Sequence, residues 1–160
     1  MNAIIPSHRV IQWMNTIRDY QKSTDIQYRI LENFWASQIE SKIWLINNVK
    51  MYLADYKPFS SVYIFGGWYG ILAQMFVDNF PNVRVTSIDI DSECAEIGSR
   101  LCNNDSRIDF KTIPMENFNS YIKPNGQILV VNTSTEHISA DVFNTWSRNI
   151  PEFSSVVLQG

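Results

Sequence analysis

Residues 61–91 constrain the fold of this chain more than any other part of the sequence. They read SVYIFGGWYGILAQMFVDNFPNVRVTSIDID: an apolar run, a glycine-rich turn, an amphipathic segment, and a second apolar run that ends in acid. Short apolar runs predict buried strands, and the spacing between them predicts a helix. A strand, a helix and a second strand in this order build a parallel sheet, because the helix crosses over to bring the second strand alongside the first.

The turn and the acid that follows it favour a nucleotide-type site. Gly66, Gly67 and Gly70 let the backbone come close to a ligand, and the helix that follows presents free N–H groups. Asp89 ends the second strand, at the edge where parallel sheets form ligand crevices, and its oxygens can accept from both hydroxyls of a ribose. Asp91 is predicted to cap the next helix. The turn matches neither GxGxxG nor a P-loop, so tight strand–helix packing without a ligand is the alternative.

The rest of residues 58–160 repeats this alternation. Apolar runs predict strands at 62–65, 83–88, 108–110, 127–131 and 155–158, with helices at 70–79, 92–101 and 139–148. The predicted fold class is α/β: a Rossmann-like parallel sheet of about five strands in the order 3-2-1-4-5, flanked by helices. Residues 58–160 form this domain.

Residues 1–57 are predicted to be helical and to cap that domain. A first helix runs from about His8 to Tyr20, with Val10, Trp13, Met14 and Ile17 on one face. One long helix, or two in succession, follows to about Asp55, with apolar residues three or four apart (Leu31, Trp35, Ile39, Ile43, Ile46, Val49 and Leu53). Trp13, Trp35 and Trp44 are expected in the core or an interface. The segment could serve as a substrate lid or as the surface of a homodimer.

Composition excludes several classes of protein. The 160 residues are 45% hydrophobic and 18% charged, which is typical of a globular domain. Residues 58–160 carry a net charge of −5, so nucleic acid is not the favoured partner. No run is long enough to span a membrane and no signal peptide is apparent, so a cytoplasmic location is expected. Cys94 and Cys102 are predicted to be reduced and half-buried, and no metal site is expected.

The segments SVYIFGGWYGILAQMF and VTSIDIDSECAEIGSRL resemble the first two motifs of class I S-adenosylmethionine-dependent methyltransferases, and FWASQIESKIWL resembles methyltransferase-like proteins encoded by bacteriophages. The first resemblance implies S-adenosylmethionine as the cofactor. It places the methionine end on Phe65, Gly66, Gly67 and Gly70, the ribose on Asp89, and the adenine near Ile90, Met115 and Glu116.

The resemblance also implies residues for the reaction. Asn132, at the end of the fourth strand, would lie between cofactor and substrate. Glu136-His137, just beyond this strand, resembles a Glu-His pair found in many members of the family, and histidine is the side chain type suited to take a proton from a hydroxyl acceptor near neutral pH. The alternative is that this pair only caps and orients its loop.

Two positions and the chain length differ from the family pattern. Ile64 stands where the family has an acid, Trp68 replaces the middle glycine, and the last two strands of the usual sheet have no counterpart.

The function that the resemblance implies is methyl transfer to an unidentified small-molecule acceptor. The alternatives are a non-catalytic protein that binds S-adenosylmethionine or S-adenosylhomocysteine, and a different Rossmann-like enzyme that uses a nicotinamide cofactor.

Overall fold

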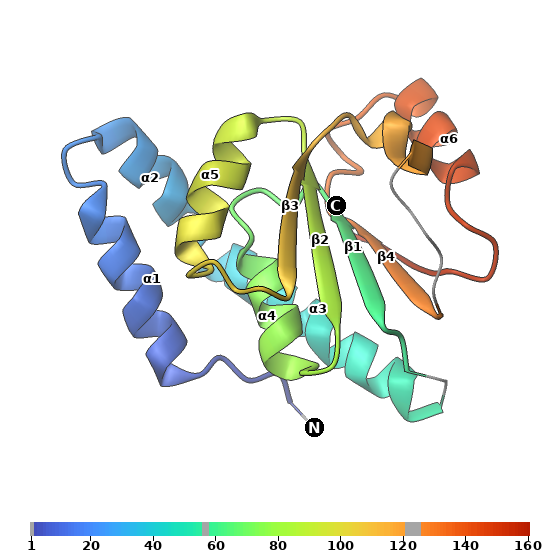
Figure 1. Cartoon of the computed structure of the whole chain (residues 1–160), viewed down its shortest axis with the longest axis horizontal. Coiled ribbons are helices and arrows are strands. Elements are labelled where there is room, and N and C mark those ends of the chain that lie inside the picture. Colours follow the sequence, from blue (N-terminus) through green and yellow to red (C-terminus); the bar gives the residue numbers. More distant parts are fainter. Residues whose placement is uncertain (1, 56–57, 121–125) are drawn as a thin grey trace.

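A parallel sheet forms the centre of the molecule (Figure 1). The computed structural model describes residues 2–55, 58–120 and 126–160. Within them the sheet has five strands in the order β3-β2-β1-β4-β5, and every neighbouring pair is parallel. The strands are β1 (Ser61–Phe65), β2 (Arg84–Asp89), β3 (Ile108–Thr112), β4 (Ile128–Asn132) and β5 (Ser155–Leu158). The predicted α/β class and strand order are confirmed.

Helices cover both faces of the sheet (Figure 1). One face carries α4 (Ile71–Asn79) and α5 (Ser92–Leu101) together with the N-terminal helices α1 (Ser7–Asp19), α2 (Thr24–Glu32) and α3 (Ala36–Asp55). The other face carries the 3₁₀-helix η1 (Met115–Ser120) and α6 (Ala140–Arg148). The carboxyl ends of the strands remain as the edge where a ligand can enter.

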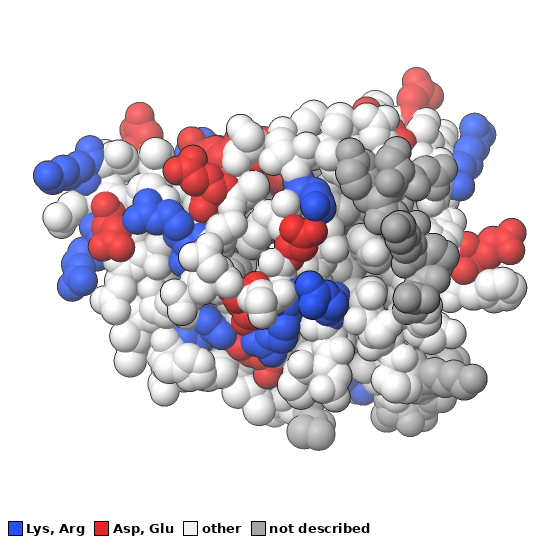
Figure 2. Space-filling view, viewed as in Figure 1, with Lys and Arg blue, Asp and Glu red and all other residues white. Residues whose placement is uncertain are grey.

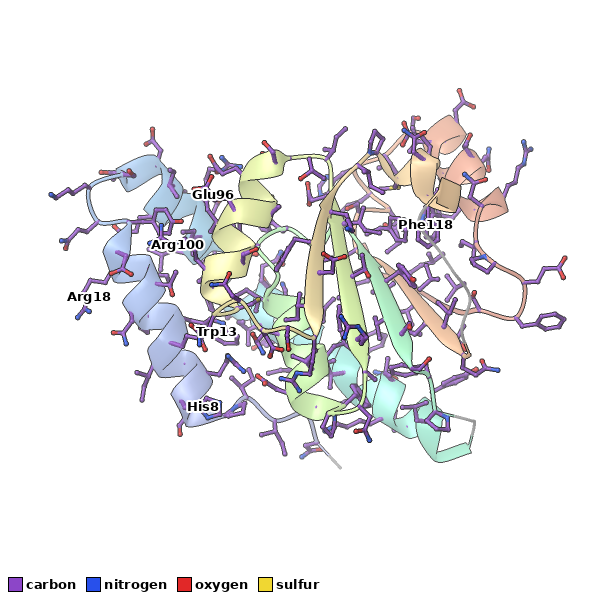
Figure 3. The ribbon with its side chains drawn as sticks, in the orientation of Figure 1. His8, Trp13, Arg18, Glu96, Arg100 and Phe118 are labelled. Carbon is purple, nitrogen blue, oxygen red and sulfur yellow. The ribbon has the colours of Figure 1, made fainter. Side chains whose placement is uncertain are left out.

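The central strands are buried on both sides, which explains their unbroken apolar sequence. In β1, Val62 and Ile64 pack with the helices of the α4 and α5 face. Phe65 points the other way and packs with Trp146 and with Phe118, which is labelled in Figure 3. β4 alternates in the same manner, so the two cores are separated by the sheet itself.

The N-terminal helices share the first of these cores rather than forming one of their own. Trp13 of α1, labelled in Figure 3, and Ile17 are buried together with Ile46 of α3 and with residues of the sheet. The predicted face of α1 is too wide, because Val10 and Met14 are exposed. The predicted division at 57/58 falls at residues 56–57, which lie outside the described residues.

The segment up to about Asp55, predicted to form one long helix or two in succession, forms two helices. The chain breaks between Glu32 and Ala36, and the predicted apolar stripe breaks with it. Leu31 and Trp35 are consequently exposed, as is Trp44 further along α3. Among the predicted core or interface tryptophans, only Trp13 is in the core.

Two further sequence expectations concern the cysteines and the membrane. Cys94 and Cys102 are free thiols, as predicted, but they are fully buried rather than half-buried. In the part of the chain that the structure describes, no helix is both long enough and apolar enough to cross a membrane.

A buried ion pair fixes α1 to α4. The guanidinium of Arg9 donates from Nε to Asp78 Oδ2 at 2.9 Å and from Nη2 to Asp78 Oδ1 at 2.8 Å. Their side chains are only 9% and 8% exposed. Each charge lies at the unfavourable end of its own helix dipole, a cation in the first turn of α1 and an anion in the last turn of α4. The pair therefore compensates two charges that would otherwise be costly.

We predict that Arg9→Met lowers the free energy of unfolding by about 3–5 kcal/mol, because it leaves the Asp78 carboxylate buried without a counter-ion. Urea denaturation measures this change. The double variant Arg9→Met/Asp78→Leu removes both charges and should recover most of the loss. Equal losses in the single and double variants would show that the charges are not what holds α1 in place.

Candidate functional site

The glycine turn after β1 is hydrogen-bonded to both neighbouring strands. Gly67 N donates to Ile88 O of β2 at 3.1 Å, and Thr133 N, just after β4, donates to Phe65 O at 3.0 Å. The hydroxyl of Thr133 also donates to Gly66 O at 2.9 Å. The turn is thereby held at the carboxyl ends of three adjacent strands.

Glycine is required in this turn because neighbouring side chains occupy the space of a Cβ. A Cβ on Gly66 would collide with Ser134 Oγ, and one on Gly67 would collide with Ser87 Oγ. Gly66 also has a φ of +68°, in the left-handed region that favours glycine. The sequence IFGGW thus folds as a turn packed closely between the ends of β2 and β4.

Trp68 adopts an unusual backbone conformation in the same turn. Its φ is +49°, which is uncommon for a bulky residue. Its ring stacks on that of Tyr69, with centroids 5.6 Å apart. Its backbone N–H donates to Asp89 Oδ2 at 3.1 Å, so the carboxylate at the end of β2 supports the left-handed residue.

Asp89 uses both carboxylate oxygens to fix the turn and the loop after β2. Oδ2 accepts from Trp68 N, and Oδ1 accepts from Asp91 N at 3.1 Å. Each carboxylate oxygen has two lone pairs, so both retain capacity for a ligand hydroxyl. Asp91 caps α5 as predicted, because its side chain accepts from Glu93 N. Asp91 also pairs with Arg29 of α2, at 3.1 Å.

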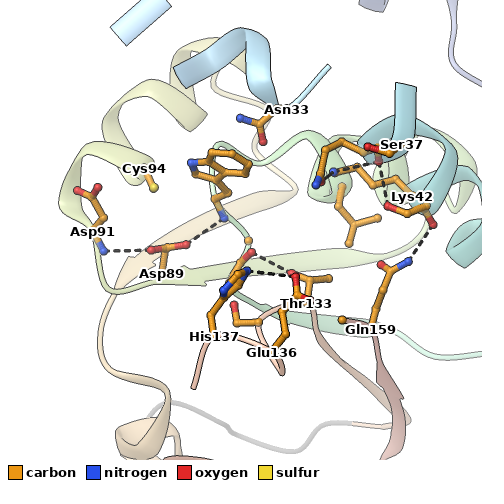
Figure 4. A pocket seen from close by; sticks show the side chains of 18 residues that line it. Asn33, Ser37, Lys42, Asp89, Asp91, Cys94, Thr133, Glu136, His137 and Gln159 are labelled. Carbon is orange, nitrogen blue, oxygen red and sulfur yellow. Dashed lines mark hydrogen bonds and ion pairs between the residues drawn. The ribbon is translucent and has the colours of Figure 1, made fainter. Parts of the chain in front are cut away.

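A cavity of about 560 Å³ opens beside Asp89 and the turn (Figure 4). This volume is within the usual range for small-molecule sites, about 300–1,000 Å³. The strand ends contribute Gly66, Gly67, Trp68, Asp89, Thr133, Ser134, Glu136, His137 and Gln159 to its lining, and the N-terminal helices contribute Asn33, Ser37, Gln38, Ser41 and Lys42. The N-terminal segment therefore forms one wall of the cavity.

Two ionisable groups in the lining have pKa values shifted by burial. Burial raises the pKa of the Cys94 thiol to about 12, so this thiol is neutral at neutral pH. Burial lowers the pKa of the Lys42 ammonium to about 8. Lys42 Nζ donates to Gln38 O at 3.2 Å and to Gln38 Oε1 at 3.1 Å. These partners are neutral, and no carboxylate of the described residues forms an ion pair with Lys42.

The loop after β4 brings Glu136 and His137 to the rim of the cavity. His137 Nε2 lies 3.2 Å from Glu136 Oε1, and the two side chains are 74% and 60% exposed, respectively. Asn132 is fully buried beneath this loop, where its Oδ1 accepts from Ser134 N at 2.9 Å. Across the described residues there is no group of three or more His, Cys, Asp or Glu side chains that could hold a metal ion.

Solved structures resemble this architecture, although no protein-family model matches the sequence and no curated protein matches it significantly. The plantazolicin methyltransferase BpumL, solved with a triazolic desmethylPZN analog and SAH, superposes with a TM-score of 0.62 at 15% identity, over 96% of this chain and 60% of that one. A mutant of MtNAS in complex with S-adenosylmethionine gives 0.59 at 12%, over 94% and 55%. The methyltransferase domain of bacterial-CtHen1-CN gives 0.56 at 14%, over 71% and 63%.

The chain has the fold of class I S-adenosylmethionine-dependent methyltransferases. The predicted resemblance is confirmed at the level of fold. The chain spans only between 55% and 63% of the length of these three structures. Ile64, where the family pattern has an acid, is fully buried in the core on the α4 and α5 face.

The methyltransferase fold brings only part of the predicted site into the cavity. Gly66, Gly67, Asp89 and His137 line it. The other predicted residues do not: Phe65 and Asn132 are buried, Gly70 packs against Phe110 with a φ of +79°, Ile90 is 74% exposed, and Met115 and Glu116 lie in η1. Met115 contacts the buried Asn132, because its sulfur accepts from Asn132 Nδ2 at 3.7 Å.

Sequence reasoning considered the N-terminal segment as a substrate lid but named none of the α3 residues that wall the cavity. Ser37, Gln38, Ser41 and Lys42 lie at helical spacing and form one polar face. That face is visible in the sequence, but the apolar stripe on the same helix predicts packing and gives no reason to expect a ligand on the polar side. Asn33, Thr133 and Gln159 carry no comparable signal, since single polar residues next to turns are common.

We predict that Gly67→Ala destabilises the protein by about 1–3 kcal/mol, the usual cost of overpacking. Most of this loss should disappear in a Ser87→Ala background, because the colliding hydroxyl is then absent. Gly66→Ala is the matched comparison: Ser134→Ala removes the colliding hydroxyl but leaves the Cβ of residue 134 at 2.9 Å from the added Cβ, together with left-handed strain of about 1–2 kcal/mol. Denaturant titration of the wild type, the four single variants and the two double variants measures this difference. Equal rescue at both positions would contradict the assignment of strain to Gly66.

We predict that Lys42→Met raises the melting temperature at pH 7, because it removes a desolvated charge. The lowered pKa means that the unfolded chain holds the proton more tightly than the folded protein between about pH 8 and the ordinary value of 10.5. The cost of the charge is complete below pH 8 and fades as the pH rises through this window. The gain should therefore shrink at pH 10. Lys22→Met, at an exposed position, is the control and should show no such pH dependence.

Proposed function

We propose that this protein is an S-adenosylmethionine-dependent methyltransferase and that its cavity binds the cofactor. The observation that carries the proposal is Asp89. Its carboxylate lies at the carboxyl end of β2, lines the cavity beside the glycine turn, and is held by two backbone N–H groups. Two carboxylate oxygens held in this way can accept hydrogen bonds from the two hydroxyls of a ribose. The structures of similar fold solved with S-adenosylmethionine or SAH support the choice of cofactor.

The rest of the cofactor would extend to either side of Asp89. The adenine would lie towards β3, against the exposed side chain of Ile90, with Met115 and Glu116 of η1 near its edge. The methionine end would lie over Gly66 and Gly67. Phe65 and Gly70 would support this end from the core, as strand end and helix start, without touching it.

Methyl transfer needs an acceptor aligned behind the methyl group and, for a hydroxyl acceptor, a group that takes its proton. His137 would take the proton, because it lies at the rim beside the turn and is oriented by Glu136. Asn132 would act through the loop, since its buried amide accepts from Ser134 N beside the turn. The acceptor is a small molecule in this proposal, because α3 walls the cavity.

Other classes of partner receive less support. Acidic and basic side chains are interspersed on the face shown in Figure 2, without the single-sign patch typical of nucleic-acid binding. The N-terminal segment acts as a cap in this proposal. A homodimer through its helices stays a prediction, with exposed Trp44 and Met51 on α3 as candidate contacts.

A second function is favoured by Trp68. A non-catalytic protein that binds S-adenosylmethionine or S-adenosylhomocysteine would tolerate this bulky side chain in the turn, where the family has glycine. Methyl transfer to a cell extract distinguishes the two functions. Transfer that is lost in His137→Ala supports the enzyme, whereas cofactor binding without any transfer supports the binder.

We predict that the protein binds S-adenosylhomocysteine and that Asp89→Asn weakens this binding by about 1–3 kcal/mol. Asparagine keeps an acceptor oxygen for the turn but removes the charge and one acceptor. Asp91→Asn is the matched control, because it removes a neighbouring charge and retains a side chain that can cap α5. Calorimetric titration measures both variants.

Equal affinity in wild type and Asp89→Asn would reject the ribose assignment, and equal weakening in the two variants would reduce it to a general effect of charge. Titration with NAD is the third arm. Binding of NAD without binding of either sulfur nucleotide would place the protein among nicotinamide enzymes instead.

A further inference from the structure

Lys42 lies in the wall of the cavity, well away from Asp89. Figure 4 shows Lys42 on α3 beside Gln159, which follows β5, whereas Asp89 and Asp91 lie at the other end of the cavity. The two elements are connected, because Gln159 Nε2 donates to Ser41 O at 3.1 Å. Asp89 ends β2, and β1 and β4 separate that strand from β5. Lys42 therefore belongs to the acceptor-side end of the site.

Within the described residues, no carboxylate side chain of the cavity forms an ion pair with this lysine. The acidic side chains in the lining are those of Asp89, Asp91 and Glu136, and each has another partner: two backbone N–H groups, Arg29 and His137, respectively. Lys42 is the only lysine or arginine among the described residues that line the cavity. A cation that is partly removed from water without an anion is unfavourable unless a ligand supplies the partner.

The surroundings of Lys42 suit an anion with a single charge. Its neighbours in the wall are the neutral side chains of Gln38, Ser41 and Gln159, which can hydrogen-bond but add no positive charge. Phosphate groups are usually met by several cations or by the planar fork of an arginine. A carboxylate needs only one ammonium and a few neutral donors.

We propose that Lys42 binds a carboxylate of the ligand that fills the acceptor-side end of the cavity. Two sources share this chemistry: a carboxylate on the methyl acceptor, and the carboxylate of the methionine end of S-adenosylmethionine. The naming of the two ends rests on the proposed function, but the pairing of Lys42 with an anion does not.

Calorimetry on the full chain tests the proposal with wild type, Lys42→Met and Lys50→Met. Lys50 is the matched control, because it lies on the same helix but donates to Asn2 O and Asn79 Oδ1 outside the cavity. The first arm compares S-adenosylhomocysteine with 5′-methylthioadenosine, which lacks the carboxylate. If the cofactor is the source, Lys42→Met weakens binding of S-adenosylhomocysteine at least tenfold and leaves 5′-methylthioadenosine unchanged.

The second arm titrates benzoate and the neutral benzamide into protein saturated with S-adenosylhomocysteine. If the acceptor is the source, benzoate binds wild type and Lys50→Met but not Lys42→Met, and benzamide binds none of them. The ¹³Cε resonance of Lys42 should report a pKa above about 8 once the carboxylate is bound. The proposal is overturned if Lys42→Met matches wild type with all four compounds.

Failure of the proposed function gives a different result. Wild type would then bind neither S-adenosylhomocysteine nor 5′-methylthioadenosine, and the benzoate titration would be made on the protein without cofactor. Binding of benzoate that Lys42→Met abolishes would uphold the anion site, and no difference between the variants would reject it.

Discussion

The close approach of the Gly66–Gly67 turn to the ends of β2 and β4 determines how the site is built. The turn has no room for a Cβ, because Ser87 and Ser134 pack directly against it. Its backbone is bonded to both neighbouring strands. These contacts hold three strand ends in one arrangement, so Asp89 and the loop after β4 reach the same cavity from different parts of the sequence.

Charge is distributed unevenly within that cavity. Asp89 and Asp91 give one end a negative character, whereas Lys42 places an ammonium at the other end. The acidic end is satisfied by backbone N–H groups and by Arg29, whereas the hydrogen bonds of Lys42 within the described residues go to the neutral Gln38. A ligand with a hydroxyl-rich end and an anionic end would complement both.

The sequence predicts the sheet well because its evidence is local. The runs at Ile64 and Val130 are continuous where strands are buried on both faces, and glycine and acid mark the carboxyl ends. The residues with which α3 walls the cavity could not be predicted in this way. Lys42 reaches the cavity only because the N-terminal helices pack on the face of the sheet that carries α4 and α5. The exposure of Trp35 follows from a break between two helices that the apolar residues around it do not indicate.

The central claim is that this cavity binds S-adenosylmethionine with its ribose on Asp89. A crystal structure of the protein with S-adenosylhomocysteine tests it most directly. We predict that both ribose hydroxyls lie within hydrogen-bond distance of the Asp89 carboxylate and that the methionine end lies over Gly66 and Gly67. A nucleotide bound elsewhere, or a ribose turned away from Asp89, would contradict the account.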